Sequence, residues 1–309
     1  MNKEDERILS NLQQPKLKDK KLVNEWYVPE ALGLVSRALE RGDGKESLLV
    51  VGCGYGRDAF LYSLELDLDS NVVGIDLNEE SIKIAEKKAW GISEDLLKEM
   101  TPGDAKDYLD RAKKLRSKEP KFLVGDILDK NIGRKIFHES QLELFDVAVF
   151  NGVVEYFLIR RNVEQAFLNT RQLLKPKGKL VISDFAWWKP KGWGENWWEK
   201  RYRRDEEALR LIGVKGDIFG IIVVRPKGLH SEEVLSLTAK ETAQALQEGD
   251  YERLVRHWRL STIKEILKNT GFEILEKERK LGSWDVFNPL KKTKEKDKLF
   301  NYEILAKKN

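Results

Sequence analysis

Short apolar segments and amphipathic segments alternate along the chain from about residue 46 to residue 185. The apolar segments SLLVVG, NVVGIDL, KFLVGDI, FDVAVFNGV and KLVISDF are nearly continuous, which is typical of strands buried on both faces. The segments EESIKIAEKKA and VEQAFLNTRQLL between them have apolar residues at helical spacing. Asn78 is expected to cap the first of these helices, and KPKG is expected to close the second. Strands separated by helices pair in parallel through right-handed crossovers. The alternation therefore predicts a doubly wound α/β sheet with helices on both faces.

The C-terminal part is expected to complete this sheet. The segment STIKEILKNTGFEILEKE predicts a helix that ends at Gly271 and a strand after it, and NYEILAKK predicts a last strand. The result is a mostly parallel sheet of seven strands. The charged segments 92–119 and NPLKKTKEKDK are expected to form a helical insert and a loop at the solvated surface.

Residues 187–258 interrupt the alternation. They contain the basic cluster KRYRR, the apolar run DIFGIIVV, a polar helix pattern and five tryptophans, namely Trp187, Trp188, Trp193, Trp197 and Trp198. We expect them to form a lid or cap inserted between the fifth strand and the following helix. The predicted organisation is a helical extension over 1–45, a core over 46–186 and 259–309, and the insert over 187–258.

Composition excludes several classes of protein. No apolar run approaches the roughly 20 residues of a membrane span, and the start MNKEDERILSNLQQ lacks a signal-peptide core, so a cytoplasmic protein without a membrane contact is expected. The single cysteine, Cys53, excludes an internal disulfide and a cysteine-rich zinc site, and no metal site is expected. The 56 basic residues against 52 acidic ones lack the excess typical of nucleic-acid binding.

Three glycines follow the first predicted strand in VVGCGYGRDAF. Gly52, Gly54 and Gly56 allow a tight turn on which a ligand can lie against the backbone. Asp76 ends the next strand, 20 residues beyond Gly56, where a carboxylate accepts both hydroxyls of a ribose. The spacing G-x-G-x-G differs from the G-x-G-x-x-G of dinucleotide sites, which favours a smaller nucleoside ligand over a nicotinamide dinucleotide.

The ordered set VVGCGYGRDAF, VVGIDLNEESIKIAEKKA, FLVGDILD, FDVAVFNGVVEYF and LLKPKGKLVISD resembles the successive motifs of class I S-adenosylmethionine-dependent methyltransferases. The resemblance covers roughly residues 46–186 and 259–309 and implies S-adenosyl-L-methionine as cofactor. It implies contacts to the methionine part, the ribose, the adenine and the sulfonium region from Gly52, Cys53, Gly54, Gly56, Asp76, Leu77, Asp126, Ile127, Asn151 and Gly152. Helix capping is the alternative role for Asp76 and Asp126, and packing is the alternative role for Cys53.

Methyl transfer is an in-line displacement in which a base sometimes takes the acceptor's proton. Glu155 and Tyr156 follow the fourth strand, and His257 lies where the insert rejoins the core, so these three are the candidate catalytic residues. A structural role is the alternative for each. The chain has NGVVEY after the fourth strand, not Asn/Asp-Pro-Pro-Tyr/Phe, which argues against methylation of amino groups of adenine or cytosine in nucleic acids.

The insert allows two kinds of acceptor. Interleaved Trp, Lys and Arg could stack bases and hold phosphates of an RNA, or the tryptophans could build the insert's own small core and an apolar acceptor pocket. Acidic residues beside the basic ones in WWEKRYRRDEEALR favour a small-molecule acceptor methylated on oxygen or nitrogen. An RNA methyltransferase, a non-catalytic RNA-binding or assembly subunit, transfer of an aminopropyl or aminocarboxypropyl group, and, as the weakest, a nicotinamide oxidoreductase stay open as alternatives.

Overall fold

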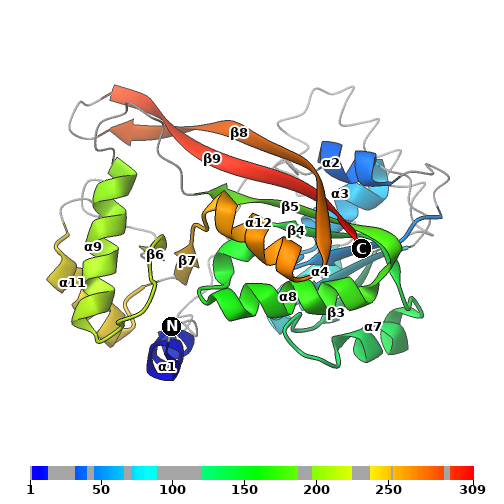
Figure 1. Cartoon of the computed structure of the whole chain (residues 1–309), viewed down its shortest axis with the longest axis horizontal. Coiled ribbons are helices and arrows are strands. Elements are labelled where there is room, and N and C mark those ends of the chain that lie inside the picture. Colours follow the sequence, from blue (N-terminus) through cyan, green and yellow to red (C-terminus); the bar gives the residue numbers. More distant parts are fainter. Residues whose placement is uncertain are drawn as a thin grey trace.

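The computed structural model describes residues 2–12, 32–39, 45–65, 71–88, 120–186, 197–224, 237–251, 253–288 and 293–309. A seven-stranded sheet with the order β3-β2-β1-β4-β5-β9-β8 forms the centre of the molecule (Figure 1). Its strands are β1 (Leu48–Val51), β2 (Val72–Asp76), β3 (Lys121–Val124), β4 (Phe145–Asn151), β5 (Leu174–Ala186), β8 (Phe272–Asn288) and β9 (Thr293–Lys308). The strands β1 to β5 are parallel and β9 is antiparallel to both β5 and β8. The predicted fold class is confirmed.

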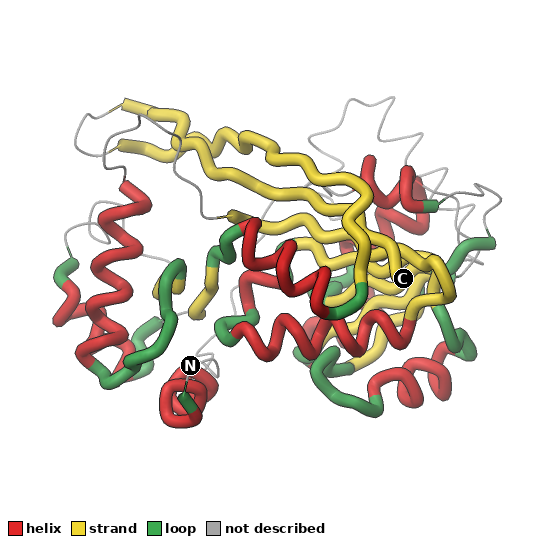
Figure 2. The backbone as a smooth tube through the Cα atoms, in the orientation of Figure 1, coloured by secondary structure: helices red, strands yellow, loops and turns green. Residues whose placement is uncertain are grey.

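Helices cover both faces of the sheet (Figure 2). One face carries α2 (Leu32–Ala38), α3 (Arg57–Glu65) and α4 (Glu79–Lys88), and the other carries α7 (Ile132–Ser140), α8 (Arg160–Leu173) and α12 (Leu260–Asn269). Alternate residues of β4 supply the two cores: Val147 and Val149 pack on the α3 side, and Ala148 and Phe150 pack on the α8 side. A strand buried on both faces needs apolar residues at every position, which explains its continuous apolar sequence.

Two predicted helix ends are confirmed by their hydrogen bonds and backbone. Asn78 Oδ1 accepts hydrogen bonds from the backbone N–H groups of Glu80 and Ser81 at 3.0 and 3.2 Å, which caps α4. Gly271, with φ of 83°, follows α12 and leads into β8. Both features are local, because each depends on residues a few positions apart in the chain.

Two segments differ from their predicted structure. The residues KPKG belong to β5 and do not close α8, and the register between β4 and β5 shifts there while Lys177 has φ of 64°. The charged segment 288–298 was expected to be a loop, but β8 extends to Asn288 and β9 begins at Thr293. An antiparallel hairpin pairs its backbone groups whatever its side chains are, so strand pairing continues through charged residues. The predicted helical insert over 92–119 lies outside the described residues.

The insert forms a small unit of its own beside the sheet. It contains α9 (Trp197–Leu211), α11 (Ala239–Glu248) and an antiparallel pair of strands, β6 (Ile221–Val224) and β7 (Arg253–Arg256). Aliphatic side chains such as Leu209, Val214 and Leu246 form its described core. The side chains of the five tryptophans assigned to this core lie outside the described residues.

The N-terminal helix α1 (Lys3–Leu12) packs on the insert and not on the sheet. Leu9 is completely buried in the aliphatic core of the insert. The backbone N–H of Lys215 donates to Asp5 Oδ1 at 2.7 Å, and the Tyr251 hydroxyl donates to the carbonyl of Leu12 at 2.6 Å. The predicted extension over 1–45 therefore serves two units, because α2 packs on the sheet and α1 completes the insert.

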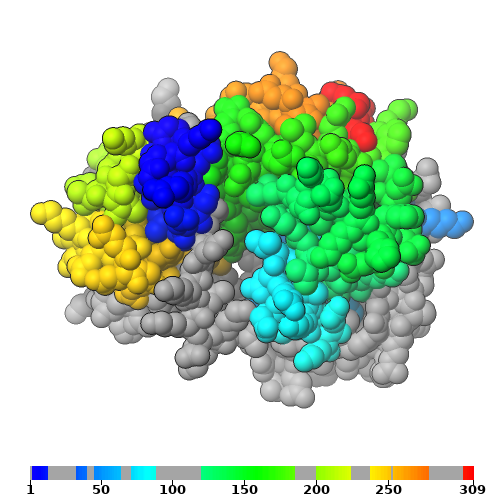
Figure 3. All heavy atoms as spheres, turned by 90° about the horizontal axis from the view of Figure 1, so that it is seen from below, coloured from blue at the N-terminus to red at the C-terminus, as the bar shows by residue number. Residues whose placement is uncertain are grey.

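The carboxyl ends of the parallel strands point toward the insert (Figure 1). Seen from below, the surface has a hollow between the insert with α1 on one side and the α4 region on the other (Figure 3). Ligands of open α/β sheets bind at this edge of the strands. Across the described ranges, none of the helices combines the length and the apolar character needed to cross a membrane.

Candidate active site

The glycine turn after β1 has a backbone that only glycine adopts easily. Gly52, Gly54 and Gly56 have φ angles of 65°, 53° and 81°. A Cβ at Gly52 would lie 2.6 Å from Val153, and one at Gly56 would lie 2.6 Å from Phe122. A Cβ at Gly54 would meet no described heavy atom within 4 Å, so the space above this residue is open on the side where a ligand would approach.

Asp76 holds the glycine turn in place and keeps capacity for a ligand. Its Oδ2 accepts a hydrogen bond from the N–H of Gly54, and its Oδ1 accepts one from the N–H of Asn78, both at 2.8 Å. A carboxylate offers about four acceptor positions, so two remain for ribose hydroxyls. Leu77, the next residue, is 71% exposed and presents an apolar surface beside the carboxylate.

Asp126 and Ile127 lie in the turn after β3. Asp126 Oδ1 accepts a hydrogen bond from the N–H of Leu128 at 2.8 Å within this turn, and the residue stays partly exposed. Asp126 does not cap a helix, because α7 begins only at Ile132 with Asn131 as its N-cap. The side chain of Ile127 is buried in the core, and its carbonyl accepts a hydrogen bond from Asn169 at 2.7 Å. Asp126 therefore presents a partly exposed polar side chain at this edge, while Ile127 does not present its side chain there.

The end of β4 carries a buried polar atom to which no described residue donates a hydrogen bond. Asn151 Nδ2 donates to Asp58 Oδ2 at 2.6 Å, while Asn151 Oδ1 is buried and accepts no hydrogen bond from the described residues. Burial raises the pKa of the Asp58 carboxyl. A Cβ at Gly152 would meet nothing within 4 Å among the described atoms. Asp58 was not among the predicted site residues, although an acid in the first turn after a glycine loop is a usable signal.

Cys53 lies inside the glycine turn but faces the core. It is buried, and a Cβ on Gly74 of β2 would lie 2.9 Å from its sulfur. Burial raises the pKa of the thiol, so it stays protonated at neutral pH. The side chain of Cys53 packs the turn against β2.

Glu155 and His257 meet although they are 102 positions apart in the sequence. Glu155 lies in the 3-10 turn η2 (Val154–Tyr156) directly after β4, and its Oε2 is 3.8 Å from His257 Nε2. On the other side of the ring, His257 Nδ1 lies 2.6 Å from the Tyr202 hydroxyl of α9. The N–H of Glu155 donates to Asp184 Oδ2 at 3.2 Å. Tyr202 and Asp184 were not among the predicted site residues, because Tyr202 lies in a basic cluster and Asp184 in an apolar strand.

Tyr156, the third candidate catalytic residue, lies outside the contact between Glu155 and His257. It is 39% exposed, and its hydroxyl accepts a hydrogen bond from Arg253 Nη1 of β7 at 2.7 Å. The Arg253 guanidinium also lies 5.7 Å from the centre of the Tyr156 ring. The structure thus brings two of the three candidate catalytic residues together and leaves Tyr156 outside their cluster.

His257 is a neutral imidazole at neutral pH. Burial, together with the charge of Arg201, lowers its pKa to about 3. The Glu155 carboxylate at 3.8 Å favours the charged ring, but the loss of water around a fully buried imidazole outweighs it. Burial also raises the pKa of Tyr202, so its phenol stays protonated.

The low pKa of His257 predicts acid sensitivity. Because the unfolded chain binds a proton near pH 6.5 and the folded protein does not until about pH 3, stability is lost as the pH falls through this window. Between pH 7 and pH 5 the loss from this residue is about 2 kcal/mol. Urea unfolding of the wild type and of His257→Gln at both pH values measures it. We expect the variant to lose about 2 kcal/mol less than the wild type, and equal losses would contradict the assignment.

Most of the chain matches a known family of protein domains. The profile of a methyltransferase domain family matches residues 24–277, which is most of the chain. The chain belongs to this methyltransferase family. It is accordingly an enzyme that uses S-adenosylmethionine as its cofactor. No protein with a curated function matches the chain.

Solved structures share the fold of this methyltransferase. One is an S-adenosylmethionine-dependent methyltransferase from Methanosarcina mazei, with 18% identity, a TM-score of 0.55, and coverage of 89% of this chain and 96% of that one. Another is a proposed methyltransferase from Bacillus halodurans, with 14% identity, a TM-score of 0.50, and coverage of 90% and 98%. At such identities the likeness concerns the fold.

The residues at the carboxyl edge fit this cofactor, which supplies a methyl group on a sulfonium sulfur. The free acceptor positions of Asp76 suit the ribose, and the exposed Leu77 suits the adenine. The open space above Gly54 and the buried Oδ1 of Asn151 suit the methionine part with its ammonium group. In the described part of the chain, no group of three or more His, Cys, Asp or Glu residues is arranged to hold a metal ion.

Proposed function

We propose that this methyltransferase acts on an oxygen or nitrogen atom of a low-molecular-weight acceptor bound between the insert and the ends of β4 and β5. The acceptor atom forms its bond to the methyl carbon as the carbon–sulfur bond breaks, and the acceptor loses a proton. The protein then contributes alignment and a place for that proton.

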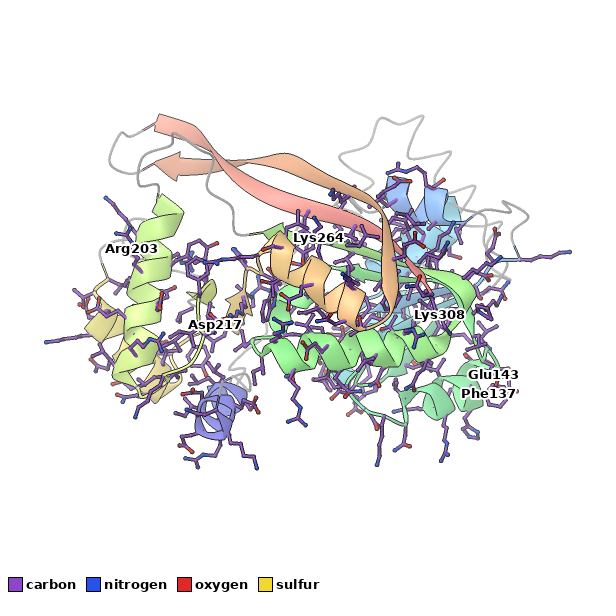
Figure 4. The ribbon with its side chains drawn as sticks, viewed as in Figure 1. Phe137, Glu143, Arg203, Asp217, Lys264 and Lys308 are labelled. Atoms are coloured by element: carbon purple, nitrogen blue, oxygen red, sulfur yellow. The ribbon has the colours of Figure 1, made fainter. Side chains whose placement is uncertain are left out.

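The observation that carries the proposal is how the insert closes on the segment after β4. Trp258 Nε1 donates to the carbonyl of Phe157 at 3.0 Å, and Arg256 Nη1 donates to the carbonyl of Leu158 at 2.8 Å. Arg256 Nη2 also donates to Asp217 Oδ2 at 2.8 Å, and Asp217 is labelled on the insert in Figure 4. The insert therefore forms a wall beside the reacting end of the site, which favours a small acceptor over a folded RNA.

Glu155 is the residue we assign to receive the acceptor's proton. It follows β4, next to the residues that fit the methionine part of the cofactor, and it is buried. The neutral His257, with a pKa of about 3, is a weaker base than an ordinary carboxylate, so it positions Glu155 and does not replace it. Tyr202 in turn fixes the ring of His257 through the 2.6 Å contact.

The acceptor class is tested by methyl transfer from S-adenosylmethionine labelled in its methyl group. The enzyme is incubated separately with the low-molecular-weight fraction of a cell extract and with total RNA, with Asp76→Ala as the inactive control. We expect label in the small-molecule fraction with the wild type alone. Label in RNA would instead establish the RNA methyltransferase, and binding of S-adenosylhomocysteine without transfer to either fraction would favour the non-catalytic subunit.

A further inference from the structure

A buried amide from α8 holds the turn that follows β3. Asn169 is 4% exposed, and its Nδ2 donates to the carbonyl of Ile127 at 2.7 Å and to the carbonyl of Asp129 at 3.3 Å. Its Oδ1 accepts a hydrogen bond from Gln165 Nε2, one turn earlier on the same helix, at 2.8 Å. The two carbonyls belong to residues 125–129, which we call the β3 turn, and lie 42 and 40 positions from Asn169 in the sequence. The contact is therefore a product of the tertiary fold.

The chemistry of this position calls for an amide. Both groups that face Asn169 Nδ2 are carbonyls, so they require a side chain with two N–H donors, which aspartate and leucine lack. Burying an amide is favourable only when its polar atoms are hydrogen-bonded, and both the nitrogen and the oxygen of Asn169 are. Its neighbours Ala166 and Phe167 on α8 fill the core with apolar side chains. The amide therefore serves the β3 turn.

The β3 turn carries Asp126 at the carboxyl edge of the sheet. The N–H of Gly125 donates to the carbonyl of Asp76 at 2.8 Å, so the turn is tied to the residue that suits the ribose. Asp126 is partly exposed; its Oδ1 accepts from the N–H of Leu128, and its Oδ2 makes no hydrogen bond to the described residues. The turn thus lies between two anchors, Asp76 on β2 and Asn169 on α8, and keeps one carboxylate oxygen available to a ligand.

The strand order places the base of the cofactor at the β3 turn. The strands run in the order β3-β2-β1-β4; the glycine turn that suits the methionine part follows β1, and Asp76, which suits the ribose, ends β2. A ribose carries the methionine part on C5′ and the base on C1′, so a cofactor that extends from β1 to β2 continues toward β3. The available oxygen of Asp126 accepts a hydrogen bond from the 6-amino group of adenine and repels a carbonyl oxygen at the same position.

We infer that Asn169 is a positioning residue through which the enzyme selects adenine over a base with a carbonyl at position 6. Asn169 lies behind the β3 turn and acts through Asp126. It holds the carbonyls of Ile127 and Asp129, and this fixes the backbone from which the Asp126 carboxylate reaches the carboxyl edge. Without the amide both carbonyls lose their donor, and the turn is free to move the carboxylate away from the base. The inference concerns the cofactor and does not depend on the acceptor of the proposed function.

Calorimetry with S-adenosylhomocysteine and S-inosylhomocysteine tests the inference, because the second ligand has a carbonyl oxygen in place of the 6-amino group. We expect the wild type to bind the adenosyl ligand about tenfold more tightly than the inosyl ligand, or more. Asn169→Leu should reduce this preference to about threefold or less, mainly by weakening the adenosyl ligand. Gln165→Leu removes the donor that orients the amide, at a half-buried position with less risk of misfolding, and should reduce the preference by about threefold.

Thr170→Val is the matched control for damage to α8. Thr170 is also buried, and its Oγ1 donates to the carbonyl of Ala166 at 2.7 Å within the helix, with no contact to the β3 turn. Whatever its effect on stability, this variant should keep the wild-type preference.

Asp126→Ala should abolish the preference, and adding Asn169→Leu to it should change the ratio of the two affinities no further, because Asn169 acts through Asp126. The inference would be overturned by a preference that persists in both Asn169→Leu and Gln165→Leu, by an equal loss in Thr170→Val, or by a further change of the ratio in the double variant. A wild type that binds both ligands equally, or neither, would overturn it as well.

Discussion

Replacing Asp76 by alanine is expected to weaken binding of S-adenosylhomocysteine by at least a hundredfold. Each hydrogen bond from a ribose hydroxyl to a charged carboxylate contributes about 1.5–3 kcal/mol, and two are lost together. The variant also frees the N–H of Gly54, which Asp76 Oδ2 holds at 2.8 Å, so the glycine turn loses a tether. Calorimetry with the purified protein measures the affinity directly.

Asn78→Ala is the control for damage to the same region. Asn78 caps α4 through two backbone N–H groups, and its loss should lower the free energy of unfolding by about 1 kcal/mol. Its affinity for S-adenosylhomocysteine should stay within about twofold of the wild type. If Asp76→Ala also bound the ligand at nearly the wild-type affinity, the ribose would lie elsewhere.

Alanine at Gly54 and at Gly56 should separate ligand binding from folding. A Cβ at Gly56 would lie 2.6 Å from Phe122 and 2.9 Å from Ala85, and φ is 81°, so Gly56→Ala should lose about 2–4 kcal/mol of stability. A Cβ at Gly54 meets no described atom, so Gly54→Ala should lose only about 1 kcal/mol, from its φ of 53°. The added methyl group would fill the space intended for the cofactor and weaken S-adenosylhomocysteine binding at least tenfold.

Urea unfolding and calorimetry on both variants measure this contrast. Gly54→Ala should unfold at nearly the same urea concentration as the wild type but bind S-adenosylhomocysteine weakly. Gly56→Ala should unfold at a much lower urea concentration. A Gly54→Ala variant with unchanged affinity would show that the ligand does not lie on this part of the backbone. A fully stable Gly56→Ala would show that Phe122 can move aside.

The strands and helices of the core were predictable because their signals are local. Continuous apolar runs give β1, β2 and β4, and the cap at Asn78 and the glycine at Gly271 mark helix ends within a few residues of their partners. The KPKG segment was misassigned for a related reason. A proline–glycine segment predicts a turn in isolation, while pairing of β5 with β4 across a shifted register draws it into the sheet.

The candidate active site also has one part that the sequence predicts and another part that it does not. Gly54 and Asp76 were predictable because they lie at the carboxyl ends of β1 and β2, and parallel strands bring their carboxyl ends to one edge of the sheet. The contact of Tyr202 with His257, and the hydrogen bond from the N–H of Glu155 to Asp184, leave no pattern in the sequence.

The sequence by itself determined the alternation of strands and helices, the glycine turn and the acid at the end of β2, because these depend on neighbouring residues. The tertiary structure alone decided where α1 packs, since its amphipathic pattern requires an apolar partner without specifying which one. It also decided the protonation of His257, because the pKa falls to about 3 only when other elements remove water from the ring. Burial by distant segments is a property of the packed chain, and no local stretch of sequence encodes it.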